Sequence, residues 1–459
     1  MGGPGPTDRF APAPRTRGRA QAVGDEPRPA GEWLVDVARK AVKTQRSRFA
    51  LARHVGSVYR VGAAWRSYRR VVFRSWEIDF AARTVRLEFL DGRVVQKPMR
   101  VEVPTGSVRR SAMDLERRMM LLTLDDGKTL EVDIGVPGQA VPTDVPVVYL
   151  DQLHWISLAQ QLWAPHRLRA PEREAAETLL NLAREQRILV PVAGAHLTEM
   201  ASVAGRRRRD LAATILGVCR GWQMQNPVRI RRQEYVASMS GQDPVAADVF
   251  TLEPGVVFAD GPAPPAPMPG APPDLAQMLT RVIAISAVYS AVLEDEPLDM
   301  REGKAAAERW ARAFPPLAKC MREQRMSAEN ARTNARARLI ADQREDIARA
   351  AAHADVMQKR FAEWVADEFP EELTQMPYVA RLGEVLYLRL RNADEKWEAN
   401  DLNDMNFLCA AAGYADITIG EKKTIEYLRR AEPRLRPGSQ LCRRLSEAVD
   451  ILANRGINP

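Results

Sequence analysis

The chain has 459 residues, with 67 lysines and arginines against 59 aspartates and glutamates, and a formal net charge of +8. Its longest uncharged apolar run, residues 282–293, is shorter than the roughly 20 residues that cross a bilayer, and the N-terminus lacks the apolar stretch of a signal peptide. We therefore expect a soluble, cytoplasmic protein with no membrane partner. The cysteines lack C-x-x-C spacing and the five histidines are scattered, which argues against a zinc site or a disulfide framework.

The positive charge is concentrated at the start of the chain. Residues 1–75 contain 16 lysines and arginines against 5 acidic residues, a net charge of +11, so the remainder carries −3. Residues 1–31 are dense in proline, glycine and arginine, which predicts a disordered basic tail. Residues 32–70 follow as a basic segment with helical spacing of apolar residues. This arm is either an attachment point for nucleic acid or a solvated tail.

Residues 71–135 have the pattern of a small antiparallel β module. Alternating apolar residues surround Asp91-Gly92, and the same arrangement recurs 35 positions later around Asp126-Gly127. Asp-Gly between alternating apolar residues is a strong hairpin signal. We expect a duplicated β module that binds RNA, docks a partner or acts as a spacer. Residues 136–146, rich in proline and glycine, are the expected linker to the next domain.

The remainder of the chain alternates between predicted strands and helices. Apolar runs at 147–150, 188–192 and 417–419 predict buried parallel strands, with a helix at 171–186 after the first. This alternation favours a doubly wound α/β sheet with flanking helices. We expect a domain over 147–432, interrupted by a helical insertion at about 226–390 that includes a proline-rich stretch, and a C-terminal helix and tail over 433–459.

Carboxylates stand at the ends of these elements. Asp151 ends the first strand, Glu199 lies on the helix after the second, and Asp404 begins an alanine-rich helix with Asp401 one turn earlier. Glu421 follows the last strand. Since ligands bind at the carboxyl ends of parallel strands, Glu421 is favoured over Asp416, which precedes that strand. Helix capping or ordinary surface exposure would also explain each residue taken alone.

Crowded carboxylates need a cation to offset their repulsion. Oxygen ligands suit Mg²⁺ or Mn²⁺, both of which bridge to phosphate. The pattern therefore predicts a divalent metal site formed by Asp151, Glu199, Asp401, Asp404 and Glu421, and metal-assisted hydrolysis of phosphodiester bonds.

The segments VVYLDQLHWISLA, ILVPVAGAHLTEMA, DMNFLCAAA and ITIGEK resemble, in order and context, the conserved segments of PIN-domain nucleases. The resemblance covers roughly residues 146–225 and 391–432. It implies a PIN-like parallel sheet and an Mg²⁺- or Mn²⁺-dependent ribonuclease, with Asp151, Glu199 and Asp404 in metal-binding positions. The family usually has aspartate after the final strand, where this chain has Glu421, so the resemblance leaves the number of ions open.

Basic residues close to these segments are candidate phosphate contacts. They are the run Arg206, Arg207, Arg208 and Arg209, and Lys422 beside Glu421. A solvated charge run explains the arginines equally well.

The first functional hypothesis is a metal-dependent endoribonuclease, in a bacterial toxin or defence context, with a regulatory protein partner. The alternatives are a catalytically inactive PIN-like scaffold that binds RNA or protein, and a structure-specific DNA nuclease, because nothing in the sequence reads the 2′-hydroxyl. The sequence does not indicate an oligomeric state.

Overall fold

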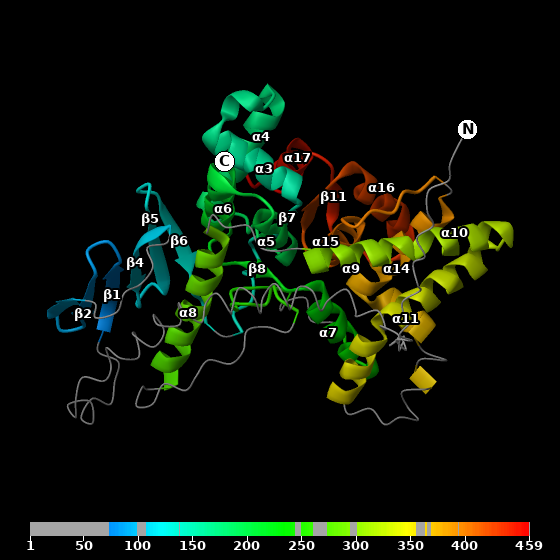
Figure 1. Ribbon diagram of the computed structural model, residues 1–459, viewed down its shortest axis with the longest axis horizontal. Helices are drawn as coiled ribbons and strands as arrows, with labels where there is room; N and C mark the ends of the chain where they lie inside the picture. Colours follow the sequence, from blue (N-terminus) through cyan, green and yellow to red (C-terminus); the bar gives the residue numbers. More distant parts are fainter. Residues whose placement is uncertain are drawn as a thin grey trace, which may run out of the picture.

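The computed structural model describes residues 73–98, 107–136, 138–243, 249–259, 273–293, 301–354, 363–364, 369–392 and 394–458. The expected basic tail, 1–31, and basic helical segment, 32–70, lie outside the described residues. Within the described ranges, an antiparallel sheet lies at one end of the molecule and the helices within residues 301–391 lie at the other, whereas the insertion helix of residues 273–293 lies beside the antiparallel sheet (Figure 1). A small parallel sheet lies between them.

The antiparallel β module has six strands in the order β3-β2-β1-β4-β5-β6. They are β1 Phe73–Asp79, β2 Thr84–Phe89, β3 Val94–Pro98, β4 Val108–Asp114, β5 Met119–Leu124 and β6 Thr129–Asp133. The two Asp-Gly turns join β2 to β3 and β5 to β6, and Gly92 and Gly127 have φ of +82° and +84°. The antiparallel fold expected for this region is confirmed.

The strand register shows that the module consists of two equivalent halves. Trp76 pairs with Leu87 in the first half, and the residues 35 positions later, Ser111 and Leu122, pair in the second. The outer strand pairs repeat with the same offset. The first strands of the two halves, β1 and β4, pair with each other in the middle of the sheet.

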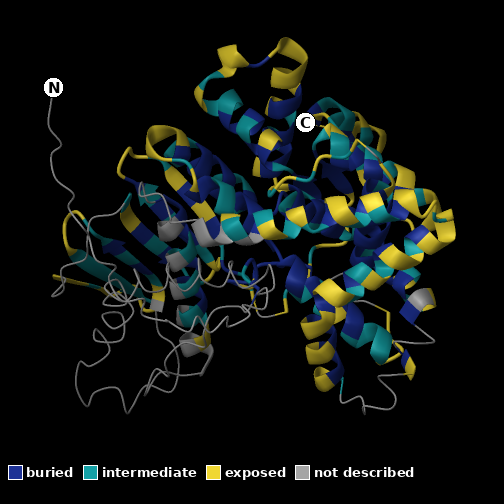
Figure 2. Ribbon diagram, turned by 45° about the vertical axis from the view of Figure 1, so that its right-hand side comes forward, coloured by how far each residue is buried: buried dark blue, intermediate teal, exposed yellow. Residues whose placement is uncertain are grey.

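The two halves differ in burial. In β5 every second residue is buried, with Met120, Leu122 and Leu124 facing the core, whereas no residue of β2 or β3 is buried. The second half packs on α6 (Gly205–Cys219), and α6 contacts α8 (Pro273–Leu293). Figure 2 shows the resulting contrast between buried and exposed residues. The second half therefore joins the module to the rest of the protein.

The parallel sheet has the order β11-β10-β7. Its strands are β7 Val148–Leu150, β10 Ile417–Ile419 and β11 Gln440–Cys442. In β7 and β10 all residues are buried, as expected for strands covered on both faces. Leu150 lies opposite Ile419, so the carboxyl ends of β7 and β10 are level with each other.

Two expectations for this region need correction. The predicted strand at 188–192 forms only single bridges, from Leu189 to Val147 and from Val192 to Gln223. Pro191, between them, has no N–H to donate to a strand ladder. In addition, residues 433–459 contain the strand β11 besides the expected helix. The described residues thus establish a three-stranded parallel sheet, and its assignment to a PIN-like fold stays a proposal.

Helices surround the parallel sheet and form the insertion. Those near the sheet are α3 Gln152–Trp163, α4 Ala170–Arg184, α5 Gly194–Ala201, α15 Asp401–Tyr414, α16 Lys422–Ala431 and α17 Leu445–Asn454. The insertion has α7 Pro227–Met239, α8, α9 Arg301–Arg312, α10 Phe314–Glu323, α11 Ala328–His353, α13 Phe369–Glu372 and α14 Pro377–Arg391, besides the two-stranded sheet of β8 (Gln223–Met224) and β9 (Phe250–Thr251). The 3-10 turns are η2 Pro165–Arg167, η5 Leu373–Gln375 and η6 Glu432–Arg434. No helix in these described ranges combines the length and apolar character needed to cross a membrane.

A buried carboxylate connects the insertion to the sheet domain. Glu234 on α7 is fully buried, and it accepts hydrogen bonds from the backbone N–H groups of Tyr378 (2.6 Å) and Val379 (2.9 Å) at the start of α14. It also accepts one from the Tyr414 hydroxyl at the end of α15 (2.7 Å). These contacts satisfy N–H groups that a helix start leaves without partners. They also fix α15, which carries Asp404, against the insertion.

Candidate metal centre

Asp151 lies at the carboxyl end of β7, in the N-cap position of α3. Its Oδ1 accepts a hydrogen bond from the backbone N–H of Gln152 (2.7 Å), and the backbone N–H of Glu421 also bonds to its carboxylate. Its own N–H donates to the carbonyl of Ile419, the last residue of β10 (2.9 Å). Asp151 thus joins the ends of two adjacent strands and caps a helix as well.

Glu421 lies two residues beyond β10, in the N-cap position of α16. Its side chain makes no capping bond to the helix backbone, and Oε1 accepts a hydrogen bond from the Thr424 hydroxyl instead (2.9 Å). The strand pairing places Glu421 at the same sheet edge as Asp151.

Asp404 and Glu199 come from two helices near this edge. Asp404 lies in the first turn of α15, which begins at Asp401 and not at Asp404 as the sequence suggested. The helix dipole favours negative charge at that position. Glu199 lies on α5, which follows the segment that bridges to β7. Both carboxylates are only partly exposed.

The pKa values show that these four carboxylates affect one another. Burial raises the pKa of Asp404 to about 8, with further contributions from the charges of Asp151, Glu421, Glu199 and Asp401. Burial and the charge of Asp151 raise the pKa of Glu199 to about 7. The pKa of Asp151 is also raised, chiefly by burial and then by Glu421. Asp151, Glu199, Asp404 and Glu421, here termed the acidic edge, form no ion pair within the described part of the chain.

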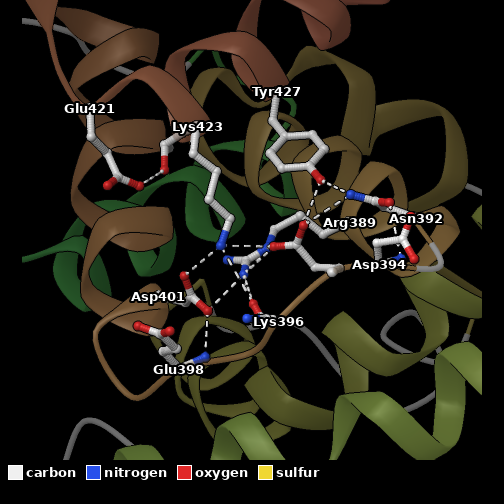
Figure 3. A network of polar contacts seen from close by, with 11 residues as sticks. Arg389, Asn392, Asp394, Lys396, Glu398, Asp401, Glu421, Lys423 and Tyr427 are labelled. Atoms are coloured by element: carbon white, nitrogen blue, oxygen red, sulfur yellow. Dashed lines mark hydrogen bonds and ion pairs between the residues drawn. The ribbon is translucent and has the colours of Figure 1, made fainter.

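Asp401 is in a different situation from the acidic edge (Figure 3). Its Oδ2 pairs with the guanidinium of Arg389 (2.7 Å), and its Oδ1 with the ammonium of Lys423 (3.3 Å). Glu395 pairs with the same two cations, at 2.6 and 2.9 Å. The two acids and two bases balance in charge. Asp401 therefore has its counter-ions already, although it was a candidate metal ligand.

The network around Asp401 holds the loop before α15 in place. Arg389 is 2% exposed, and its guanidinium lies over the ring of Trp397 (4.3 Å). The Tyr427 hydroxyl donates to Glu395 (2.7 Å). Burial raises the pKa of Glu395, but hydrogen bonds from Lys423 and Tyr427 outweigh it and hold that pKa below its ordinary value. The network thus joins α14, the loop and α16, and so positions the start of the helix that carries Asp404.

Asp416 lies at the opposite edge of the sheet. It directly precedes β10, and its Oδ2 accepts a hydrogen bond from the backbone N–H of Val147 (2.9 Å). Its Oδ1 pairs with Arg455 (3.3 Å). Asp416 therefore does not contribute to the acidic edge.

The four arginines at the start of α6 have different environments. Arg208 is 1% exposed and donates a hydrogen bond to the carbonyl of Val292 (3.3 Å), so it is part of the protein interior. Arg209 pairs with Asp125 of the β module (3.3 Å). Arg206 lies 3.7 Å from Asp210 with its side chain 90% exposed, and Arg207 is also exposed. Lys422 is exposed at the start of α16. Only Arg206, Arg207 and Lys422 of this set are accessible to a substrate.

Tyr149 is a neighbour of the acidic edge and packs against His196. Their rings stack at 5.5 Å, and both are buried. The Nδ1 of His196 accepts from the backbone N–H of Ala193 (3.0 Å), and burial lowers its pKa to about 3, so the ring is neutral. Burial and the charges of Asp151, Glu199 and Asp404 raise the pKa of Tyr149. Tyr149 could not be recognised from the sequence as a neighbour of the carboxylates, because its position in an apolar run indicates only a buried strand.

The fit of a cation to the acidic edge rests on its chemistry. Four carboxylates lie near one another there and form no ion pair in the described part of the chain, and oxygen ligands of this kind suit Mg²⁺ or Mn²⁺. Within the described residues, however, no three or more His, Cys, Asp or Glu side chains are grouped closely enough to hold a metal ion. The acidic edge is therefore a set of neighbouring carboxylates and not a preformed ligand cage.

Comparisons with known proteins add no relative. No protein family, curated protein or solved structure matches this chain. The assignment of a function therefore depends on the residues described above.

Proposed function

We propose that the chain is a metal-dependent nuclease that hydrolyses phosphodiester bonds, with RNA as its substrate. The observation that carries the proposal is the meeting of Asp151 and Glu421 at the carboxyl ends of adjacent parallel strands, with Asp404 and Glu199 beside them and no basic partner in the described residues. The resemblance of these segments to PIN-domain nucleases supports the same reading. Mg²⁺ or Mn²⁺ bound there would make water a better nucleophile and offset charge that develops on the phosphate.

Each residue has a distinct role in this proposal. Asp151 would be the most rigid ligand, because two backbone N–H groups hold its carboxylate. Glu421 is oriented by Thr424, and Asp404 by the start of α15. Glu199 would complete the set by a side-chain rearrangement, because the four carboxylates do not form a ligand group as they stand.

Exposed cations would hold the substrate. Lys422 neighbours Glu421 in sequence and is free to contact a phosphate next to the scissile one. Arg206 and Arg207 offer further contacts with the phosphate backbone of the nucleic acid. The N-terminal arm, with its net charge of +11 over residues 1–75, would add a sequence-independent attraction for nucleic acid.

The second candidate is a catalytically silent scaffold that binds RNA or a regulatory protein. The specific observation in its favour is the absence, among the described side chains, of a group arranged to hold a metal. The two candidates differ in cation binding, because a scaffold has no need of one. A DNA nuclease is a third candidate, with the same chemistry at the same residues.

The test uses the purified full-length protein with matched RNA and DNA oligonucleotides, in Mn²⁺, in Mg²⁺ and in EDTA. The double variant Asp151→Asn/Asp404→Asn removes two charges from the acidic edge, and Asp416→Asn is the control at the opposite edge of the sheet. We expect the wild type and the control to cleave RNA only with a divalent cation. The double variant should lose more than the roughly 10–100-fold that removal of an outer-shell partner causes. Calorimetry with Mn²⁺ alone gives a readout independent of cleavage.

Three outcomes decide between the candidates. Cleavage that survives the double change would refute the acidic edge as the catalytic site. A wild type that binds RNA but neither cleaves it nor binds Mn²⁺ would identify the scaffold. Faster cleavage of the DNA strand than of the RNA strand would identify the DNA nuclease.

A further inference from the structure

A second charged site lies away from the acidic edge, in a cavity of about 140 Å³ between α11, α14, η5 and η6. Arg332 and Arg336 reach it from α11, and Arg434 from η6. Glu384 on α14 is the acidic residue of its lining. Ala380 and Gly383, also on α14, are the smallest residues of the lining.

The charges in this cavity do not balance. Glu384 is paired with Arg332, because the Nε of Arg332 donates a hydrogen bond to the Oε1 of Glu384 (2.7 Å). The guanidinium of Arg332 also lies over the ring of Tyr387 (4.1 Å). Within the described part of the chain, no ion pair or hydrogen bond engages the side chains of Arg336 and Arg434. Burial, and then the charge of Arg332, lower the pKa of Arg336 although Glu384 raises it. Three guanidinium groups and one carboxylate thus line the cavity, and that carboxylate is hydrogen-bonded to Arg332.

The size of the cavity limits what it can hold. Its volume is far above the roughly 10–15 Å³ that one water needs, and below the roughly 300–1,000 Å³ of pockets for drug-sized ligands. Arginine is the residue that best matches tetrahedral oxyanions, because its planar fork donates two parallel hydrogen bonds. A phosphate group satisfies both the size and the charge.

We propose that this cavity is a phosphate-binding site in which Arg336 and Arg434 are the primary ligands and Arg332, fixed by Glu384, lines the wall. The site is separate from the acidic edge. β10 and β11 are parallel, so α16, which connects them, must run from the carboxyl edge of the sheet to its amino edge. Arg434 follows the far end of α16, about 15 Å along the ten-residue helix from Glu421.

The experiment measures binding to the full-length protein by calorimetry in EDTA, so its result is independent of divalent metal and of nuclease activity. The probes are inorganic phosphate, adenosine 5′-monophosphate and a single-stranded RNA oligonucleotide, with sodium sulfate and sodium chloride for comparison at equal ionic strength. The test variant is Arg336→Gln/Arg434→Gln. The control is Arg322→Gln/Arg349→Gln, which removes two charges from exposed positions outside the cavity.

We expect the wild type and the control to bind phosphate saturably with equal affinity. The test variant should bind about tenfold more weakly or worse, because it loses charge-assisted hydrogen bonds to the ligand. Its midpoint of thermal unfolding without phosphate should fall little, because neither removed guanidinium makes a hydrogen bond or ion pair in the described part of the chain. Added phosphate should raise the midpoint of the wild type and of the control, but not that of the test variant. That second measurement separates lost binding from misfolding.

The three probes identify the source of the phosphate group. Loss of affinity for inorganic phosphate and the monophosphate identifies a free phosphate or nucleotide as the ligand. Loss for the oligonucleotide alone identifies the backbone of a nucleic acid. The proposal is overturned if the test variant keeps the wild-type affinity for all three probes, or if the wild type binds none of them.

Discussion

Asp404→Asn removes one of four mutually repelling carboxylates while it keeps the shape of the side chain. The pKa of Asp404 rises from its ordinary 3.8 to about 8 in the folded protein. Because each pH unit is worth about 1.4 kcal/mol, this carboxyl destabilises the folded state by up to about 4 kcal/mol at pH 7. The asparagine amide is still a polar group that is largely buried, which costs part of this free energy, so we expect a measurable gain of about 2 kcal/mol.

The sign of the pH dependence follows from the raised pKa. Below about pH 4 the carboxyl is protonated in both folded and unfolded chains, so the variant gains nothing. Between pH 4 and pH 8 the unfolded chain ionises freely and the folded one does not, so the gain grows with pH. Above the folded-state pKa of about 8 the gain is constant.

Urea denaturation of wild type and Asp404→Asn in EDTA, at pH 4.5 and pH 7.5, measures this gain. A parallel series in Mn²⁺ should raise the stability of the wild type far more than that of the variant, because a ligand stabilises only the state that binds it. The reasoning is refuted if the variant is less stable than the wild type at pH 7.5, or if its gain is the same at both pH values. Either result would mean that the four carboxylates are not crowded.

Three further predictions concern other residues. Asp401→Asn should lower the free energy of unfolding by about 2 kcal/mol, because the buried Arg389 loses a partner, with cleavage per folded molecule little changed; wild-type stability in urea would contradict it. Glu421→Gln should weaken Mn²⁺ binding about tenfold in calorimetry with no loss of stability, because the amide oxygen still accepts from Thr424; unchanged affinity would remove Glu421 from the metal set. Gly127→Ala should lower the free energy of unfolding by about 1–2 kcal/mol, because φ at this turn is +84°. Wild-type stability of this variant in urea would contradict the prediction.

The β module shows both the strength and the limit of prediction from this sequence. The two Asp-Gly turns identified β2, β3, β5 and β6, because glycine is the residue that such turns require. The strands β1 and β4 were not resolved individually, since the turns that follow them use Arg83 and Arg118 at φ of +55° and +51°. An arginine in the left-handed region carries no turn signal in a sequence.

For residues that directly flank a strand, the direction of that strand predicted at which edge of the parallel sheet they lie. The order of apolar runs indicated that Asp151 and Glu421 share an edge and that Asp416 does not, and the pairing of β7 with β10 has this geometry. The short strand β11 was missed, because it follows Pro437 and Gly438 and buries only Cys442.

Charge pairing was the part that the sequence could not provide. The i, i+3 spacing of Asp401 and Asp404 suggested one function for both, yet Asp401 pairs with Arg389 and Lys423 from neighbouring helices. Such partners depend on tertiary packing, which spacing along one helix does not encode. For the same reason, the arginine run at 206–209 gave no indication that Arg208 is buried in the core.

The repeat within the β module has a consequence for its symmetry. Because β1 and β4 occupy equivalent places in the two halves and pair antiparallel, with Glu77 opposite Ala112, a local two-fold axis passes between these two residues. Two separate copies of one three-stranded half, joined edge to edge through their first strands, would form the same six-stranded sheet. The module therefore has the geometry of a homodimer fused into one chain, in which the second half has become the main attachment to the protein core and the first half buries only Trp76 and Ile78.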